Sequence, residues 1–206
     1  AAIKGYKVII TMPDKMSQEK GSILELLGAD IIRTPTNTPS ESPDSHINMA
    51  KQIRDTINIL KPNTAHILDQ YSNPSNPMVH YDTTALELLK QSNNKIDMIV
   101  IGAGTGGTIS GVAKRLKEKL GNKVQVIGVD PHGSLLAKGN EEVYNYDVEG
   151  IGYDFIPDVL NRDNIDDWVK TTDKEAFTMA RELIRYEGLL IGGSSGSIMF
   201  GAIQAI

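Results

Sequence analysis

The chain has 206 residues, of which 40% are hydrophobic and 23% are charged, and its formal net charge is −5 at pH 7. This length suffices for one large domain or two small ones with a substantial core. The negative charge argues against nucleic acid or an anionic membrane as the main partner. The absence of cysteine excludes a disulfide framework, a thiolate nucleophile and a zinc knuckle. Because the sequence has no apolar run of about 18 residues and opens on no signal peptide, we expect cytoplasmic residence.

Both ends of the sequence are typical of a fragment. It begins at Ala1 without an initiator methionine, and residues 1–5 match the last turn of a helix that stops at Gly5. The final residues, 197–206, continue an apolar helical pattern without a stop signal. We therefore expect the chain to be an internal piece of a longer protein.

The first part of the chain alternates between strand and helix patterns. Residues 6–12 are β-branched and apolar, which predicts a buried strand. Ser17 is a candidate N-cap for a helix that runs to Leu27, and residues 29–34 predict the next strand. A strand, a helix and a strand at this spacing predict a right-handed parallel crossover.

The middle of the chain is less regular. Residues 35–43 are rich in Thr, Ser and Pro and predict an exposed loop, and residues 45–58 predict a helix. A short strand is predicted at 66–69. Two Asn-Pro steps within 73–77 favour turns over helix, and a helix is predicted at 81–91.

The second half repeats the strand and helix order around a long irregular segment at 133–150. Thr172 and Glu175 fit a capping box for a helix that Gly188 stops. The other elements predicted here are a strand at 98–101, a helix at 109–120, a strand at 124–129, and a strand at 189–191 that leads into a last helix.

Repeated β-α order predicts an α/β fold with an open parallel sheet and helices on both faces. Residues 73–77 are the best candidate for a passage between two lobes, 1–77 and 78–206. In such sheets, ligands bind beyond the carboxyl ends of the strands. The two glycine turns and the segment at Gln70 and Tyr71 all follow predicted strands, so we expect them to converge on one cleft.

A glycine loop after the strand at 98–101 predicts a phosphate site. Four glycines fall within six residues before the next helix, and a helix N-terminus offers free N–H groups and a positive dipole end to an anion. Glycine lets the backbone approach the anion without a Cβ in the way. Thr105 and Thr108 add hydroxyl donors. The alternative is a tight strand-to-helix turn that binds nothing.

The same loop also matches the dinucleotide fingerprint, with Gly102, Gly104 and Gly107 at the required spacing. Asp130 ends the next strand, where an acid would contact the ribose of NAD. A NAD-binding Rossmann oxidoreductase therefore stays open as an alternative. The match is weak, because a glycine loop after a strand also holds a simple phosphate.

Other candidate residues favour structural roles. The four histidines show no metal-ligand spacing, so surface or turn positions are expected for His46, His66, His80 and His132. Ser194 and Ser195 lie outside a Gly-x-Ser-x-Gly elbow, which argues against a serine nucleophile, and a helix cap is one interpretation of Ser194. The basic residues on the helix at 109–120 predict a solvated face: Lys114, Arg115, Lys117 and Lys119.

Several motifs together resemble one enzyme family. Residues 104–108 are similar to the phosphate loop of fold-type II pyridoxal-phosphate enzymes, and residues 192–197 are similar to their late loop, whose serine faces the pyridine nitrogen. Three further stretches, at 33–37, 68–71 and 149–157, narrow the resemblance to the cystathionine β-synthase family. The resemblance covers nearly the whole chain. A cysteine synthase, the alternative within this group, is expected to carry a small pair where this chain has Tyr153 and Asp154.

The resemblance implies a tryptophan synthase β-like α/β fold with two lobes, each built on a parallel three-layer α/β/α sheet. The small mobile lobe would be 1–77, incomplete at its N-terminus, and the large cofactor lobe 78–206, incomplete at its C-terminus. The implied reaction is a β-replacement that condenses L-serine with L-homocysteine to L-cystathionine, a step of transsulfuration and cysteine biosynthesis.

The resemblance also implies the site residues. The phosphate of pyridoxal 5′-phosphate would be held by Gly104, Thr105, Gly106, Gly107 and Thr108, and its ring nitrogen by Ser194. The substrate would be lined by Gln70, Tyr71, Gly150 and Tyr153. No metal ligand is implied.

Some family features are missing from this sequence. The Schiff-base lysine of the family lies in a Ser-x-Lys-Asp-Arg motif, and no lysine here has that context, so we expect no catalytic residue in this chain and no activity from it alone. The Ser-Gly-Asn-Thr-Gly substrate loop, the haem segment of animal members and the regulatory domains are missing too. Haem is therefore expected only through a segment of the full-length protein. The expected partners are small molecules, L-serine and L-homocysteine, within a homodimer or homotetramer, with no nucleic acid and no membrane.

Overall fold

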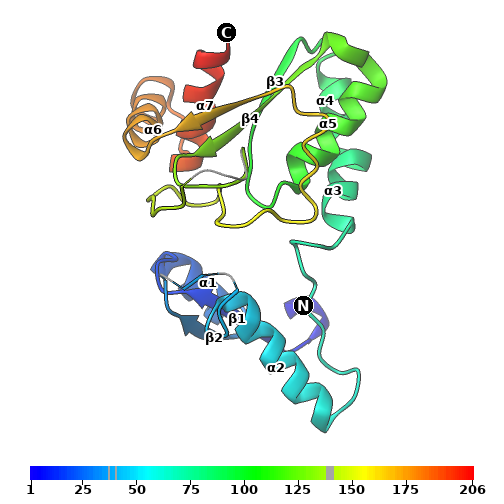
Figure 1. Ribbon diagram of the computed structural model, residues 1–206, viewed down its shortest axis with the longest axis vertical. Helices are drawn as coiled ribbons and strands as arrows, with labels where there is room; N and C mark the ends of the chain where they lie inside the picture. Colours follow the sequence, from blue (N-terminus) through cyan, green and yellow to red (C-terminus); the bar gives the residue numbers. More distant parts are fainter. Residues whose placement is uncertain (37, 40, 138–141) are drawn as a thin grey trace. The chain divides into compact units, whose positions relative to one another are not determined.

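The computed structural model describes residues 1–36, 38–39, 41–137 and 142–206 (Figure 1). Asn37, which closes the stretch at 33–37, and residues 138–141 of the segment expected to be irregular lie outside the described residues. The chain divides into two compact units, Ala1–Leu68 and Asp69–Ile206. This boundary precedes the 73–77 segment, and the functional lobes 1–77 and 78–206 stay a prediction.

The first unit is a parallel strand pair with two helices. Its elements are the 3₁₀ turn η1 (Ala2–Lys4), β1 (Val8–Pro13), α1 (Gln18–Leu26), β2 (Ala29–Thr34) and α2 (His46–Leu60). Val8 lies opposite Ala29 and Pro13 opposite Thr34, so the two strands run parallel, as predicted. The chain turns from α1 into β2 at Gly28, whose φ of 85° is a left-handed conformation that glycine adopts without strain.

The second unit carries a three-stranded parallel sheet. Its elements are α3 (Ser75–Val79), the π-helical turn η2 (His80–Thr84), α4 (Ala85–Gln91), β3 (Met98–Gly102), α5 (Gly107–Leu120), the 3₁₀ turn η3 (Gly121–Lys123), β4 (Gln125–Pro131), β5 (Asp167–Thr171), α6 (Asp173–Glu187) and α7 (Gly193–Ala205). The strand order is β3-β4-β5. In β4 every residue after Gln125 is buried, as expected for a central parallel strand.

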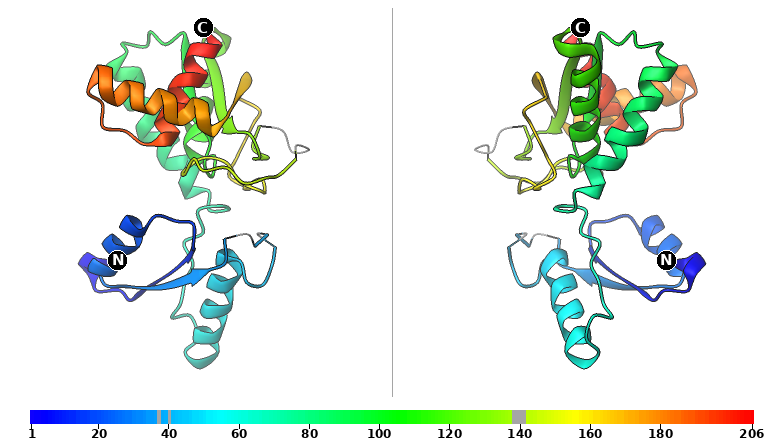
Figure 2. Two further views of the ribbon diagram at one scale, coloured as in Figure 1. Left: turned by 90° about the vertical axis from the view of Figure 1, so that its left-hand side faces the viewer. Right: turned by 90° about the vertical axis from the view of Figure 1, so that its right-hand side faces the viewer.

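Helices cover both faces of this sheet (Figure 1). On one face, α5 packs its buried residues Ile109 and Val112 toward Ile99 and Ile101 of β3. On the other face, α7 contacts all three strands, and a Cβ built at Gly201 would lie 2.6 Å from a methyl group of Val129. The irregular segment after β4, yellow in Figure 2, gathers at one end of this unit. The predicted α/β arrangement with covered parallel strands is confirmed.

Two predicted strands are wrong. Residues 66–69 and 189–191, all within the described part of the chain, are coil. Leu68 and Leu190 are 84% and 94% exposed. These short apolar runs are therefore mostly exposed, and an isolated extended segment gains no ladder hydrogen bonds.

The helix predicted at 81–91 begins earlier than expected, at Ser75. Pro74 is its N-cap and Pro77 lies in its first turn, where backbone N–H groups have no intrahelical partner anyway. The two Asn-Pro steps therefore start a helix here instead of excluding one. From Ser75 the helical chain continues without a break through η2 into α4.

Strand β5 has no counterpart in the sequence prediction. Its five residues carry only two large apolar side chains, Trp168 and Val169, between polar ends. The strand forms because it pairs with β4 and because Trp168 covers Gly128, where a Cβ would lie 2.4 Å from the indole. A pattern five residues long contains none of this long-range information.

The caps of α6 agree with the sequence. The Thr172 side chain accepts from the Glu175 N–H while the Glu175 carboxylate accepts from the Thr172 N–H, which is a complete capping box. Gly188 follows with a left-handed φ of 68°.

Among the described residues, no helix is long and apolar enough to cross a membrane.

The β4–β5 connection is tied to α5 by a three-way contact that predicts a pH-dependent loss of stability. Lys117 Nζ lies 2.8 and 2.7 Å from the two carboxylate oxygens of Asp166, and the Val126 N–H donates to the same carboxylate at 2.7 Å. Partial burial raises the pKa of Asp166, but the bonds from Lys117 and Val126 outweigh it and hold the pKa below its ordinary 3.8. A depressed folded-state pKa stabilises the fold above the unfolded-state pKa, and this stabilisation disappears as the pH falls through the folded value.

We expect Asp166→Asn to lower the free energy of unfolding by about 1 kcal/mol at pH 7, since the pair is partly exposed. The difference from wild type should vanish as the pH falls below 3.8. Urea unfolding of both proteins at pH 7 and at a pH below 3.8 measures this difference. Asp163→Asn, a change of the same kind in the same connection, should stay within about 0.5 kcal/mol of wild type. A deficit of equal size at both pH values would contradict the ion-pair explanation.

Candidate active site

The glycine loop between β3 and α5 gives the first N–H groups of α5 no side-chain cap among the described residues, although Gly106 and Gly107 are themselves buried. Gly106 is the N-cap, with φ 89° and ψ −2°, and no side chain among the described residues caps the helix. A Cβ at Gly106 would lie 2.6 Å from a methyl group of Leu160. The loop therefore fits its surroundings only with glycine at this position.

Two side chains from the α3–η2 stretch contact the threonines of this loop. Asn76 Nδ2 lies 3.0 Å from Thr105 Oγ1 and 2.7 Å from the Gln70 carbonyl oxygen. His80 Nε2 lies 3.1 Å from Thr108 Oγ1. His80 is half-buried at the start of the π-helical turn η2, which agrees with the expected surface or turn position.

The segment at 150–157 lies directly against the glycine loop. A Cβ at Gly104 would lie 2.8 Å from the Gly150 carbonyl oxygen, and the Gly152 N–H donates to the Ala103 carbonyl at 2.8 Å. A Cβ at Gly150 would in turn lie 3.8 Å from Ser194 Oγ. Three segments that are far apart in sequence thus meet at the carboxyl end of β3.

Ser194 does not cap its helix. It is the second residue of α7, the N-cap is Gly192, and no side chain within the described residues bonds to the helix start. The interpretation of Ser194 as a helix cap is therefore wrong, and its hydroxyl points to the neighbourhood of Gly150.

Three aromatic rings form a cluster beside this segment. The ring centroids of Tyr71 and Tyr153 are 5.5 Å apart, and each lies 5.3 Å from that of Phe155. The Val159 N–H donates to the Tyr71 carbonyl at 3.1 Å. Burial is the main cause that raises the pKa of both tyrosine hydroxyls, so both remain protonated donors at neutral pH.

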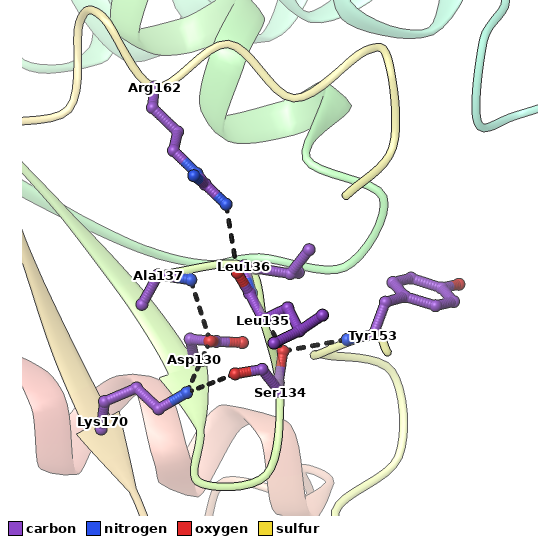
Figure 3. A network of polar contacts seen from close by, with 8 residues as sticks. All are labelled: Asp130, Ser134, Leu135, Leu136, Ala137, Tyr153, Arg162 and Lys170. Atoms are coloured by element: carbon purple, nitrogen blue, oxygen red, sulfur yellow. Dashed lines mark hydrogen bonds and ion pairs between the residues drawn. The ribbon is translucent and has the colours of Figure 1, made fainter. Parts of the chain in front are cut away.

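A buried polar network holds the backbone of Tyr153 (Figure 3). Ser134 Oγ accepts from the Tyr153 N–H at 3.0 Å. Lys170 Nζ donates to the Ser134 carbonyl at 2.8 Å and to Asp130 Oδ2 at 2.9 Å. The same Asp130 oxygen accepts from the Ala137 N–H at 3.0 Å. The end of β4, the turn after it and the Tyr153 backbone are thereby joined.

This network also weakens the dinucleotide alternative. Asp130 is fully buried and paired with Lys170, so its carboxylate cannot reach a ribose hydroxyl.

The basic face of α5 is only partly solvated. Lys114 and Lys119 are exposed, as predicted, but Arg115 stacks on the Tyr81 ring at 4.1 Å and the Lys117 ion pair described above is partly buried.

The structure brings all ten predicted site residues into the second unit, and contacts link Gln70 and Tyr71 to the glycine loop, the 150–157 segment and Ser194. Sequence reasoning missed the supporting residues Asn76, His80 and Ser134. The signal for the first two was their spacing of four, which places them on one helix face. That signal stayed hidden because the Asn-Pro steps indicated turns.

Comparison with known proteins gives matches over the whole chain. The family profile described as "Pyridoxal-phosphate dependent enzyme" matches residues 1–206. A cystathionine beta-synthase of Dictyostelium discoideum is 61% identical over 208 residues, which cover 100% of this chain and 41% of that protein. That of Oryctolagus cuniculus is 57% identical over 209 residues, covering 100% and 37%. That of Saccharomyces cerevisiae is 50% identical over 212 residues, covering 98% and 41%.

The chain thus spans about two fifths of the length of these curated relatives. The sequence resemblance to cystathionine β-synthases is confirmed by identities of 50% to 61%. Parallel strands with a glycine loop at the carboxyl end of β3 agree with the family profile. The chain belongs to the family of pyridoxal-phosphate-dependent enzymes.

Proposed function

We propose that the protein carrying this chain condenses L-serine with L-homocysteine to L-cystathionine, using pyridoxal 5′-phosphate. The observation that carries the proposal is the meeting of the glycine loop, Gly150 and Ser194 at one strand end. The high identity to cystathionine beta-synthases supports the choice of reaction. Tyr153 and Asp154 also favour it over a cysteine synthase, which is expected to carry a small pair at this position.

The residues of the glycine loop fit a phosphate group. The start of α5 carries no side-chain cap among the described residues, so its N–H groups can donate to an anion near the positive end of the helix dipole. We infer that Gly104, Thr105, Gly106, Gly107 and Thr108 hold the phosphate. In this arrangement the glycines let the backbone approach, and the two threonines add hydroxyl donors.

Ser194 fits the pyridine nitrogen of the cofactor because its hydroxyl is free of any capping role. A neutral serine, unlike an aspartate, would leave that nitrogen largely unprotonated and thus favour elimination over transamination. When bound, pyridoxal phosphate supplies the electron sink for removing the α-proton and the β-substituent. Ser194 then has one task, which is to orient the ring through one hydrogen bond.

The substrate side of the site is formed by Gln70, Tyr71, Gly150 and Tyr153. Asn76 fixes the Gln70 backbone, and ring contacts with Phe155 fix the two tyrosines. The side chains of Tyr71 and Tyr153 hydrogen-bond to each other, and we infer that this protonated pair keeps one hydroxyl donor for the polar groups of the amino acid. Their rings exclude water from it. Gly150 leaves room, since a side chain there would point at Ser194.

Gly106→Asp tests the phosphate assignment. A Cβ at this position would collide with Leu160 at 2.6 Å, and the carboxylate would repel a phosphate dianion. We expect the variant to lose most of the bound cofactor during dialysis, as measured by absorbance. Gly121→Asp is the matched control. It sits at the other end of α5 with a left-handed φ of 66° and nothing within 4 Å of the added Cβ. Retention by Gly106→Asp equal to that of the control would remove the loop from the phosphate site.

Tyr153→Ala tests the substrate assignment. Loss of this ring opens the cluster with Tyr71 and removes a donor, so we expect KM for L-serine to rise about tenfold or more. Cofactor retention should stay at the wild-type level, because the ring lies on the substrate side. Tyr186→Ala, which removes a 71% exposed ring on α6, is the control and should leave KM unchanged. Unchanged KM in both variants would contradict the assignment of Tyr153.

A further inference from the structure

The α3–η2 stretch fits against two glycines on one face of α5. A Cβ at Gly107 would lie 1.9 Å from Asn76 Oδ1, and a Cβ at Gly111 would lie 2.1 Å from the Pro77 carbonyl oxygen. Because the two glycines are four residues apart, they form one groove along α5. The groove lets Asn76 and His80 reach Thr105 and Thr108, so both hydroxyls of the loop have a partner from the same helical stretch.

The Asn76 contact fixes the direction of the Thr105 hydroxyl. The Gln70 carbonyl oxygen can only accept, so the side-chain nitrogen of Asn76 must face it. The same nitrogen faces Thr105 Oγ1 at 3.0 Å and can only donate. Thr105 is therefore the acceptor in this bond, and its own proton remains available for another acceptor.

The His80 contacts leave two arrangements open. The ring lies between two hydroxyls, with Nδ1 3.0 Å from Thr84 Oγ1 and Nε2 3.1 Å from Thr108 Oγ1. Burial lowers the pKa of His80 below its ordinary 6.5, so the ring is neutral at pH 7 and donates from one nitrogen only. If Nδ1 carries the proton, Thr108 must donate its hydroxyl proton to Nε2, and this proton is then not available to another acceptor. If Nε2 carries it, Thr108 accepts and its proton is free.

We propose that Asn76 and His80 are positioning residues that turn the hydroxyl protons of Thr105 and Thr108 toward a bound phosphate, with the His80 proton on Nε2. In this tautomer the Thr84 hydroxyl donates to Nδ1. The inference rests on the proposed function, because it assigns the phosphate to the cofactor. It gives the π-helical turn a role, since η2 begins at His80 and places Thr84 beside Nδ1.

The tautomer is measured directly in the protein that carries this chain. With ¹⁵N-labelled histidine and saturating pyridoxal phosphate at pH 7, the His80 ring should show a protonated Nε2 and an unprotonated Nδ1. The His80 signals are assigned by their loss in a His80 variant. A protonated Nδ1, or a ring protonated on both nitrogens, would overturn the proposal.

Binding of pyridoxal phosphate, compared with binding of pyridoxal, isolates the phosphate contribution. In His80→Gln the amide nitrogen can take the place of Nε2, and we expect affinity within about twofold of wild type. In His80→Asn the amide is too short to reach Thr108, and we expect pyridoxal phosphate to bind about tenfold more weakly, the effect of one hydrogen bond to a charged group. Pyridoxal, which lacks the phosphate, should bind all three proteins equally.

Asn76→Asp tests the second contact, because a carboxylate can only accept and would draw the Thr105 proton inward. We again expect about tenfold weaker pyridoxal phosphate binding with pyridoxal unaffected. Asn94→Asp adds the same charge at an exposed position beyond the end of α4, where aspartate tolerates the left-handed φ of 58°, so it should bind like wild type. If His80→Asn and Asn76→Asp weaken the binding of pyridoxal phosphate and of pyridoxal equally, the two residues have a merely structural role and the proposal is overturned.

The outcomes separate this inference from the proposed function. If the wild type binds pyridoxal phosphate and the variants bind it equally well, only the positioning role fails. If the wild type binds no pyridoxal phosphate at all, the proposed function fails, and the inference falls with it. An unchanged ratio of the affinities for pyridoxal phosphate and pyridoxal is thus distinct from an absence of binding.

Discussion

The arrangement of the second unit depends on backbone segments that approach glycines more closely than any side chain allows. The Gly150 carbonyl lies where a Cβ of Gly104 would be 2.8 Å away, and the Pro77 carbonyl lies where a Cβ of Gly111 would be 2.1 Å away. Ordinary contacts begin near 3.4 Å. A methyl group at either position would push apart the segments that carry the proposed substrate side and the proposed phosphate side of the site. The glycines therefore act as points of assembly, in addition to giving the loop its turn.

A second constraint is the buried charge behind the site. Removing Asp130 and Lys170 from water costs free energy that their attraction only partly recovers, so the pair is weak evidence for stability. Its bonds reach the Ala137 N–H and the Ser134 carbonyl, and Ser134 in turn holds the backbone of Tyr153 (Figure 3). Among the described residues, Asp130 Oδ1 has no partner. The pair is thus better explained by the position it gives to the turn after β4 than by its contribution to stability.

The sequence predicted those parts of the fold that are set by local chemistry. Residues 29–34 are a strand from their own pattern, and the Thr172 box caps α6 because both partners lie within one turn. The glycine loop was also predicted, since four glycines fall within six residues of the sequence there. Strand β5 and the coil at 66–69 were not predicted, because pairing and burial there depend on distant residues. The role of His80 depends on Gly111, 31 positions further along, and no periodicity in the sequence reports such a contact.

One side chain, Asn76, joins Gln70 on the proposed substrate side of the site to Thr105 on the proposed phosphate side. Asn76 donates to the Gln70 carbonyl and to the Thr105 hydroxyl from the same nitrogen. A shift of the Gln70 backbone on substrate binding would change the bond to Thr105 without any movement of the sheet. The α3–η2 stretch is therefore one connection between the two proposed halves of the site, beside the direct contact of the 150–157 segment with the glycine loop, and it belongs to the helix that the Asn-Pro steps begin.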